Sequence, residues 1–189
     1  MTGLAPFDAP MTIEDFLDFV ATRPDEEKWE LIGGEPVMNA APAWPHQRIV
    51  ARLIAALIFV EDRTAPAWSV IPGIGVRLSD ISVPVPDVLV RPREAPAGNV
   101  CDDMIVAFEV LSPSTRLRDL RWKHNAYKEL AALQHYVVIE QDRAELFVFD
   151  RASGFSERRL AGLDAVLTLD ALGVSLPLAD LYRDSGVKG

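Results

Sequence analysis

The chain is organised around the stretch PVPDVLVRPREAPAGNVCDDMIVAFEVLSPSTRLRDLRWKHNAY, residues 84–127, which contains most of the candidate catalytic residues. Residues 83–90 and 104–111 form two short apolar runs, whose Val, Ile and Phe content predicts strands. Each run contains one carboxylate, Asp87 in the first and Glu109 in the second. Because an unpaired carboxylate inside an apolar element is costly, we expect each one at an open strand end or beside a cation.

A helix is predicted after the second strand, where a Ser-Pro-Ser-Thr run ends the strand and Ser114 or Thr115 supplies the N-cap. On this helix Asp119, Lys123 and Tyr127 are spaced i, i+4, i+8, so they share one face. If that face turns toward the strand ends, an ammonium lies beside the two carboxylates. Two hard oxygen ligands beside an ammonium suit a divalent-metal site for phosphodiester hydrolysis.

Several blocks of this chain occur in an order that resembles the Uma-type putative restriction endonuclease family, within the PD-(D/E)XK nuclease superfamily. The blocks are TIEDFL, KWELIGGEPV, PHQRIVARL, PDVLV, AFEVLSPST, DLRWKHNAY and LQHYVVIEQD. The resemblance covers roughly residues 12 to 150. It implies an α/β (α+β) fold with a restriction-endonuclease-like core, in which a central mixed sheet is flanked by helices.

The resemblance also implies a catalytic site. Asp87 and Glu109 are expected to bind Mg²⁺ or Mn²⁺, which prefer carboxylate oxygens, and the Val110 carbonyl is a further expected ligand. The superfamily's usual lysine two residues after the glutamate is absent, because Leu111 stands there. The family is similar in placing its lysine on the following helix, and Lys123 fills that role. Lys123 would then hold the attacking water or stabilise charge in the transition state.

Two residues earlier in the chain have two interpretations each. Glu30, on the opposite side of a strand from its neighbours, is either a third acidic residue of the catalytic site or an exposed strand residue. His46, at the start of a helix, either contacts the substrate phosphate or the attacking water, or is a hydrogen-bonded cap residue, which is the commoner role. Glu30 and His46 are therefore both candidate residues of the catalytic site.

The helix that carries Lys123 is rich in basic residues. Arg121 and Lys128 point elsewhere on the helical wheel and are better placed to bind substrate backbone phosphates, although a solvated helix face is the ordinary interpretation of such a pattern. Asp119 is expected to pair with Lys123 or with an arginine of its own helix. Tyr127 is expected to pack and orient rather than to react.

The remaining elements follow from periodicity and turn residues. We predict a helix capped at Thr12, with its apolar face at Ile13, Phe16, Leu17 and Val20, and then a hairpin over 29–38 that turns at Gly33-Gly34, where the family usually has Asp-Gly. A helix over 46–62, an irregular strand over 68–78 and a long connection over 91–103 above the cleft follow. We predict strands over 135–140 and 145–149 and an apolar C-terminal segment over 165–181.

Composition indicates a single cytoplasmic domain of residues 1–189, with residues 1–11 as a loose tail. The chain is 49% hydrophobic and 25% charged, and its one cysteine, Cys101, excludes an internal disulfide and a cysteine-rich zinc site. We expect no signal peptide and no membrane role. The net charge of −9 argues against a general nucleic-acid binder. A bound cation would invert the local potential, so the objection is partial.

The function expected from the resemblance is that of a Mg²⁺-dependent endonuclease acting on DNA, although a ribonuclease would share the site. The alternative is a non-catalytic interaction module in which Asp87, Glu109 and Lys123 form a structural ion-pair network. Cleavage of both strands of a duplex needs two sites, which predicts a homodimer. Residues 165–181 are the expected interface, because a chain of this size can build a core without them.

Overall fold

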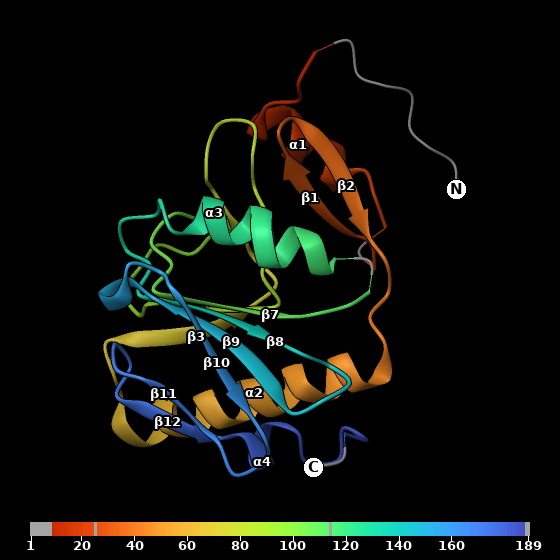
Figure 1. Ribbon diagram of the computed structural model, residues 1–189. Coiled ribbons are helices and arrows are strands. Elements are labelled where there is room, and N and C mark those ends of the chain that lie inside the picture. Colours follow the sequence, from red (N-terminus) through yellow and green to blue (C-terminus); the bar gives the residue numbers. More distant parts are fainter. Residues whose placement is uncertain (1–8, 25, 114, 188–189) are drawn as a thin grey trace.

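A six-stranded mixed sheet forms the centre of the protein in the computed structural model, which describes residues 9–24, 26–113 and 115–187 (Figure 1). The pair β7–β8 is parallel and the other pairs are antiparallel. In spatial order the strands are β10 (Glu157–Ala161), β9 (Glu145–Asp150), β8 (His135–Ile139), β7 (Val106–Val110), β5 (Val88–Pro92) and β3 (Trp68–Pro72). The expected mixed sheet flanked by helices is confirmed.

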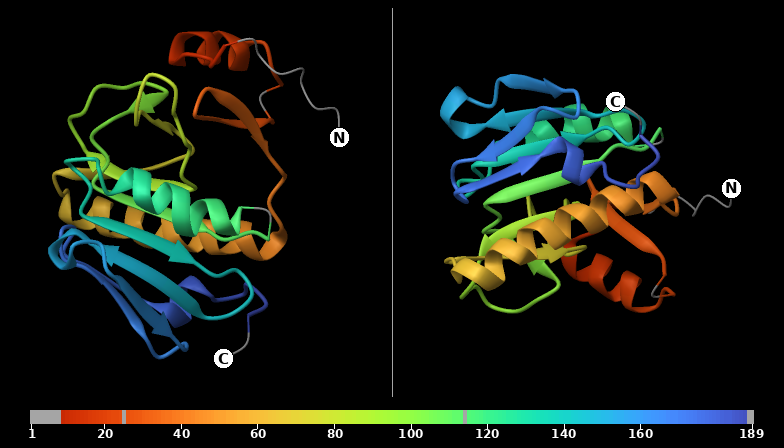
Figure 2. Two further views of the ribbon diagram at one scale, coloured as in Figure 1. Left: turned by 45° about the horizontal axis from the view of Figure 1, so that its top comes forward. Right: turned by 90° about the horizontal axis from the view of Figure 1, so that it is seen from below.

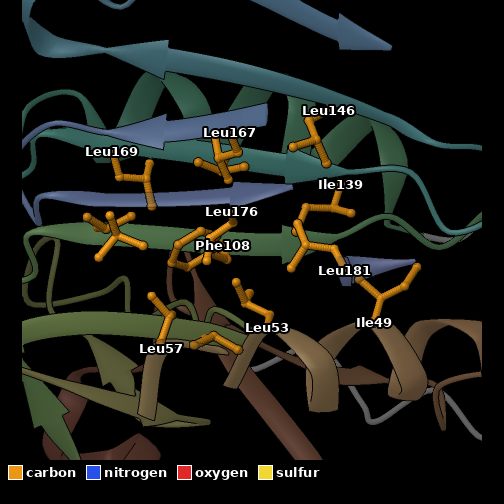
Figure 3. Packing of buried hydrophobic residues seen from close by; sticks show 14 of the residues in the cluster. Ile49, Leu53, Leu57, Phe108, Ile139, Leu146, Leu167, Leu169, Leu176 and Leu181 are labelled. Atoms are coloured by element: carbon orange, nitrogen blue, oxygen red, sulfur yellow. The ribbon is translucent and has the colours of Figure 1, made fainter. Parts of the chain in front are cut away.

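Helices cover both faces of the sheet, so its central strands are apolar on both sides. One face packs on α2 (Trp44–Thr64), whose Ile49, Leu53 and Leu57 are fully buried with Phe108 (Figure 3). The other face carries a π-helical segment, Arg118–Lys123, that continues into α3 (His124–Tyr127) (Figure 2). Strand alternation therefore sends Phe108 toward α2 and its neighbour Glu109 toward the helix that contains Lys123.

The C-terminal segment belongs to the core. Strands β11 (Val166–Leu169) and β12 (Val174–Pro177) form a hairpin, followed by α4 (Leu178–Leu181), beside α2 (Figure 1). Most of its large apolar side chains are buried with those of α2 and the sheet, namely Leu167, Leu169, Leu172, Val174, Leu176, Leu178 and Leu181. Figure 3 shows Leu167, Leu169, Leu176 and Leu181 in this packing, while Val166 is 45% exposed. The expectation that residues 165–181 are free to form a dimer interface is therefore wrong, because the single chain already buries this surface.

The N-terminal elements lie on the α3 side of the sheet (Figure 1). Helix α1 (Ile13–Ala21) begins with the predicted cap, in which Thr12 and Asp15 bond reciprocally. The predicted hairpin is β1 (Lys28–Ile32) and β2 (Glu35–Asn39), and its turn residues Gly33 and Gly34 have φ of 58° and 84°. A Cβ at Gly34 would lie 2.4 Å from Pro10, so this turn requires glycine on two counts.

Two N-terminal expectations need correction. Leu17 is not on the buried face of α1, since it is 41% exposed. The expected loose tail does not extend to Met11, which is buried and donates its amide to the carbonyl of Gly34. Residues 1–8 of that tail lie outside the described residues.

Several boundaries also differ from the expectations. The first apolar run enters its strand only at Val88, because residues 83–87 cross the end of the hairpin, where Val83 and Leu31 exchange backbone hydrogen bonds. Helix α2 starts two residues before His46. The predicted irregular strand divides at Gly73 into β3 and β4 (Gly75–Val76), and β4 pairs with β6 (Val100–Cys101).

Within residues 9–24, 26–113 and 115–187, none of the helices combines the length and hydrophobicity that crossing a bilayer requires.

Cys101 gives a simple test of this packing. Its side chain is buried, and burial raises the pKa of its thiol to about 11 against the opposing effect of Arg91. Since the thiolate is the reactive form, we expect a thiol reagent at pH 8 to label Cys101 slowly in the folded protein and rapidly in denaturant. The absorbance change with a chromogenic disulfide measures both rates. Equal rates would contradict the buried position.

Candidate active site

Asp87 and Glu109 approach each other because their strands are neighbours and their positions fall on the same face. The antiparallel register of β5 on β7 pairs Val88 with Phe108, so Asp87, immediately before β5, lies directly opposite Glu109. The backbone amide of Val110 donates to Asp87 Oδ2 over 2.8 Å. Both carboxylates line one cavity of about 200 Å³. The sequence expectation that the two carboxylates meet at neighbouring strand ends is thus confirmed.

Asp87 is fixed through one of its two oxygens. His46 Nε2 lies 3.1 Å from Asp87 Oδ2, the same oxygen that accepts the Val110 amide. No described residue donates a hydrogen bond to Oδ1, and the Asp87 side chain retains 18% exposure to the cavity. Burial opposes ionisation of Asp87, but the contacts with His46 and Val110 outweigh it and hold its pKa below the ordinary value.

His46 is a buried residue of the first turn of α2, whose backbone N-cap is Ala43. The structure places His46 in the wall of the cavity, in contact with Asp87. The Nδ1 atom of His46 is buried without a hydrogen-bond partner among the described residues. The commoner interpretation of His46, a cap residue bonded to its own helix end, does not describe this contact.

Lys123 lies beside Glu109, as the helical spacing requires. Its ammonium is 2.7 Å from Glu109 Oε1, and the Tyr127 hydroxyl donates to the same oxygen over 3.4 Å. Lys123 and Tyr127 are both buried. Burial would lower the pKa of Lys123, but the surrounding carboxylates hold it well above its ordinary value, so the ammonium stays charged.

Asp119 joins the same face through the π-helical turn. Its Oδ1 is 3.5 Å from Lys123 Nζ and 4.0 Å from Arg118 Nε, which confirms that it pairs with its own helix. The wider π turn exposes backbone carbonyls, and the carbonyl of Asp119 accepts the hydroxyl of Tyr136 from β8 over 2.9 Å. Such irregular turns are frequent at functional sites.

Glu30 of β1 is fully buried in this cluster. Its Oε1 lies 2.8 Å from Lys123 Nζ and accepts the Val85 amide, and its Oε2 lies 3.2 Å from an Arg118 nitrogen. Burial opposes its ionisation, but Lys123 and Arg118 hold its pKa below the ordinary value. Of its two interpretations, the structure excludes the exposed strand residue and places Glu30 with the other acidic residues.

Ser112 and Thr115 interact at the start of the helix. Ser112 Oγ accepts the amide of Thr115, and Thr115 Oγ1 is 3.0 Å from the Ser112 hydroxyl. The first helical residue is Arg116, so Thr115 stands directly before the helix, and Ser114 lies outside the described residues. Both Ser112 and Thr115 line the cavity.

The cavity also contains polar residues that sequence reasoning did not place there, namely Lys28, Asn39, Ser112, Thr115, Arg118 and Gln141. Gln141 follows β8, which runs parallel to β7, so the two strands deliver Gln141 and Val110 to the same end of the sheet. That parallel pairing was the signal that could have found Gln141. Its Oε1 is buried without a partner among the described residues.

Other expected residues lie outside the cavity. Arg121 is exposed, Lys128 bonds to Asn125, and neither lines the cavity, although both remain proposals for phosphate binding along the same helix. The connection over 91–103 does not cover the cavity. Its ends are closed by paired hydrogen bonds of 2.8 Å from Arg91 to Asp103, and it contributes to a separate cavity beside α1.

The site has more negative than positive side chains. Four carboxylates, those of Glu30, Asp87, Glu109 and Asp119, face two cations, Arg118 and Lys123. Burial, with help from the other carboxylates, raises the pKa of Glu109 well above its ordinary value against the pull of Lys123. Burial likewise raises the pKa of Asp119. Additional positive charge in the cavity would stabilise both carboxylates in their ionised forms.

A divalent cation fits this donor set. Among the described residues, no group of three or more His, Cys, Asp or Glu side chains is arranged to hold a metal ion. Mg²⁺ requires fewer protein ligands, because it is commonly held by one or two carboxylates and keeps several waters. Asp87 Oδ1 and Glu109 Oε2 accept no hydrogen bond from a described residue, and Val110 also lines the cavity.

The contact of His46 with Asp87 leads to a prediction. His46→Ala should weaken Mn²⁺ binding roughly 10- to 100-fold, the usual cost of losing a residue that orients a metal ligand. His46→Gln, whose amide can reach the same oxygen, should recover part of the affinity. Titration calorimetry with Mn²⁺ measures both. Wild-type affinity in His46→Ala would show that Asp87 needs no support from α2.

Comparisons with known proteins identify the family of the chain and a solved structure with a similar fold. The family model described as Uma2, putative restriction endonuclease, matches residues 13–179. A search of curated proteins finds no match. Among solved structures, the crystal structure of a putative nuclease from Anabaena variabilis, belonging to DUF820, is similar with a TM-score of 0.75 at 18% identity, over 92% of this chain and 98% of the other. That likeness concerns the fold. With the family model matching most of its length, the chain belongs to the Uma2 family of putative restriction endonucleases.

Proposed function

We propose that the protein is an endonuclease that hydrolyses phosphodiester bonds in DNA with Mg²⁺ or Mn²⁺ held by Asp87 and Glu109. One observation carries the proposal: two carboxylates from different strands meet in one cavity, each with an oxygen free of hydrogen bonds from described residues, and a buried ammonium lies 2.7 Å from one of them. Membership of the family supports the same class of reaction.

The side chains have distinct roles in this proposal. A bound divalent cation supplies a Lewis acid for the phosphoryl oxygen and lowers the pKa of a coordinated water. Asp87 and Glu109 hold it, with the Val110 carbonyl as a further ligand. Lys123 acts on Glu109, orienting that carboxylate and favouring its ionised form against burial, because its ammonium already contacts Glu30, Glu109 and Asp119. Any contact of Lys123 with the attacking water requires it to exchange one of these partners.

A plasmid-nicking assay tests the proposal. Wild-type protein should convert supercoiled DNA to nicked or linear forms in Mg²⁺ or Mn²⁺ and not in EDTA, and Asp87→Asn should reduce the rate to background. Asp170→Asn, which changes an exposed aspartate before β12, is the matched control and should cleave like wild type. Equal cleavage by Asp87→Asn and wild type would contradict the proposed role of Asp87.

A second candidate function follows from a specific observation. Lys123 is only 2% exposed and is surrounded by three carboxylates, which is also how a structural ion-pair network in a non-catalytic interaction module would look. The two candidates differ in their response to metal. An active site gains stability from millimolar Mg²⁺, whereas a closed network is indifferent to it.

Cleavage of both strands of a duplex would need two sites, so we also propose a homodimer. We expect its interface outside residues 165–181, since most of the apolar side chains there are buried in the single chain. Sedimentation velocity at micromolar protein should give the mass of two chains. A monomer would restrict the proposed activity to nicking one strand at a time.

A further inference from the structure

A second cavity, of about 740 Å³, adjoins the candidate active site between α1, β1 and the turns near residues 73–75 and 99–100. Its wall is largely apolar, with Phe16, Leu17, Val20, Trp29, Val83 and Val100 among the lining residues. Leu17 lines this cavity and is 41% exposed, whereas its neighbour Phe16 is buried. The fold leaves this surface accessible.

The two cavities share part of their walls. Val85 and Lys28 line both of them. The amide of Val85 donates to Glu30 Oε1, so the shared wall is attached directly to the cluster of carboxylates. Lys28 is exposed at the junction, and no carboxylate of a described residue lies within ion-pair distance of its ammonium. A nucleic-acid strand lying across both cavities would thus meet the carboxylates of Asp87 and Glu109 first, then the ammonium of Lys28, and then the apolar wall of the second cavity.

The aromatic part of the second cavity's wall is held in place. Trp29 donates its indole N–H to Glu27 over 2.8 Å, and the ring of Phe19 meets it edge-on at 4.9 Å. A fixed indole is a low-cost stacking partner, because little side-chain freedom is lost when a flat ligand binds.

We propose that this second cavity binds the unstacked base of a nucleotide next to the phosphodiester held at Asp87 and Glu109, so that the substrate strand is single or locally unpaired. The inference rests on the proposed function and narrows its substrate. A base inside a duplex is stacked and cannot enter a side cavity, whereas a single strand or a flipped nucleotide can. With a net charge of −9 the protein gains little from phosphate contacts, and stacking supplies affinity that charge does not.

Binding is measured by anisotropy of a fluorescent 12-mer in the Asp87→Asn background, which keeps the second cavity and removes the proposed cleavage. Leu17→Asp is compared with Ile58→Asp, which alters a residue 42% exposed on another helix, α2, with the same change in charge. Leu17→Gln is the second variant should Leu17→Asp unfold. Oligonucleotides with one abasic position, moved along the strand, locate the base that enters.

The proposal expects the single strand to bind at least tenfold more tightly than its blunt duplex, and Leu17→Asp to lose roughly tenfold to a hundredfold while Ile58→Asp loses nothing. One abasic position should cost a similar factor, and Leu17→Asp should add little to that loss. Single-strand binding unchanged in both Leu17 variants, or equal binding of duplex and single strand, overturns the proposal. Neither result depends on cleavage. Wild-type protein that binds the single strand through Leu17 but cuts no DNA in Mg²⁺ or Mn²⁺ would instead overturn the proposed function.

Discussion

Glu109→Gln is expected to leave the metal-free protein within about 1 kcal/mol of wild type, or more stable, while abolishing its stabilisation by Mg²⁺ and its cleavage of DNA. The reason is the environment of the carboxyl group. Glu109 is buried among Glu30, Asp87 and Asp119, and its pKa lies well above the ordinary value, so its charge is unfavourable in the folded protein without a metal. Glutamine removes that charge, and the ammonium of Lys123 still pairs with the carboxylates of Glu30 and Asp119.

The sign of the pH dependence follows from the same shift. A carboxyl whose pKa is raised on folding binds its proton more tightly in the native state. Wild type therefore loses stability from this group as the pH rises from the ordinary pKa of glutamate toward the raised one, and Glu109→Gln does not. Thermal unfolding of both proteins across that window, with and without Mg²⁺, gives the comparison. Glu157→Gln changes an exposed glutamate of β10 as control. Severe destabilisation by Glu109→Gln would contradict this account.

Lys123→Met should destabilise the protein by about 3–5 kcal/mol, because it leaves buried carboxylates without their cation. Glu30, Glu109 and Asp119 all lie within 3.5 Å of the Lys123 ammonium, and all three are buried. Lowering the pH should shrink the penalty, since protonation removes the uncompensated charges. Chemical denaturation at two pH values measures both effects.

Lys128→Met is the control for this prediction. Lys128 lies five positions later, directly after α3, and Asn125 is the one described residue to which its side chain bonds, so its loss should change stability by no more than about 0.5 kcal/mol. If Lys123→Met is as stable as Lys128→Met at neutral pH, the ion-pair cluster contributes nothing to the folded state. Mg²⁺ that restores part of the stability of Lys123→Met would show that the cavity accepts a cation in place of the ammonium.

The central part of the site was predictable from two sources. The resemblance to the nuclease superfamily implies that Asp87 and Glu109 share one site, and the i, i+4, i+8 spacing brings Asp119, Lys123 and Tyr127 together. Glu30 stayed ambiguous, because alternation separates the two faces of a strand without saying which one the rest of the chain covers.

Features that depend on contacts distant in sequence were not predictable. Periodicity could not reveal that His46 would reach Asp87, or that Gln141 would enter the cavity, since both depend on how strands and helices pack. Leu17 has the spacing of a core residue, but the hairpin and neighbouring turns leave a hollow beside it. The apolar segment over 165–181 was misjudged for the opposite reason, because an apolar pattern does not distinguish a core from an interface.

In crystals of the protein soaked with Mn²⁺, anomalous scattering locates the bound ion without reference to activity. We expect one strong peak in the cavity between Asp87 Oδ1 and Glu109 Oε2, about 2.1 Å from each oxygen, that disappears in Asp87→Asn. A cavity in which saturating Mn²⁺ gives no peak, with Lys123 still on Glu109, would contradict the proposed metal site and favour the structural ion-pair network.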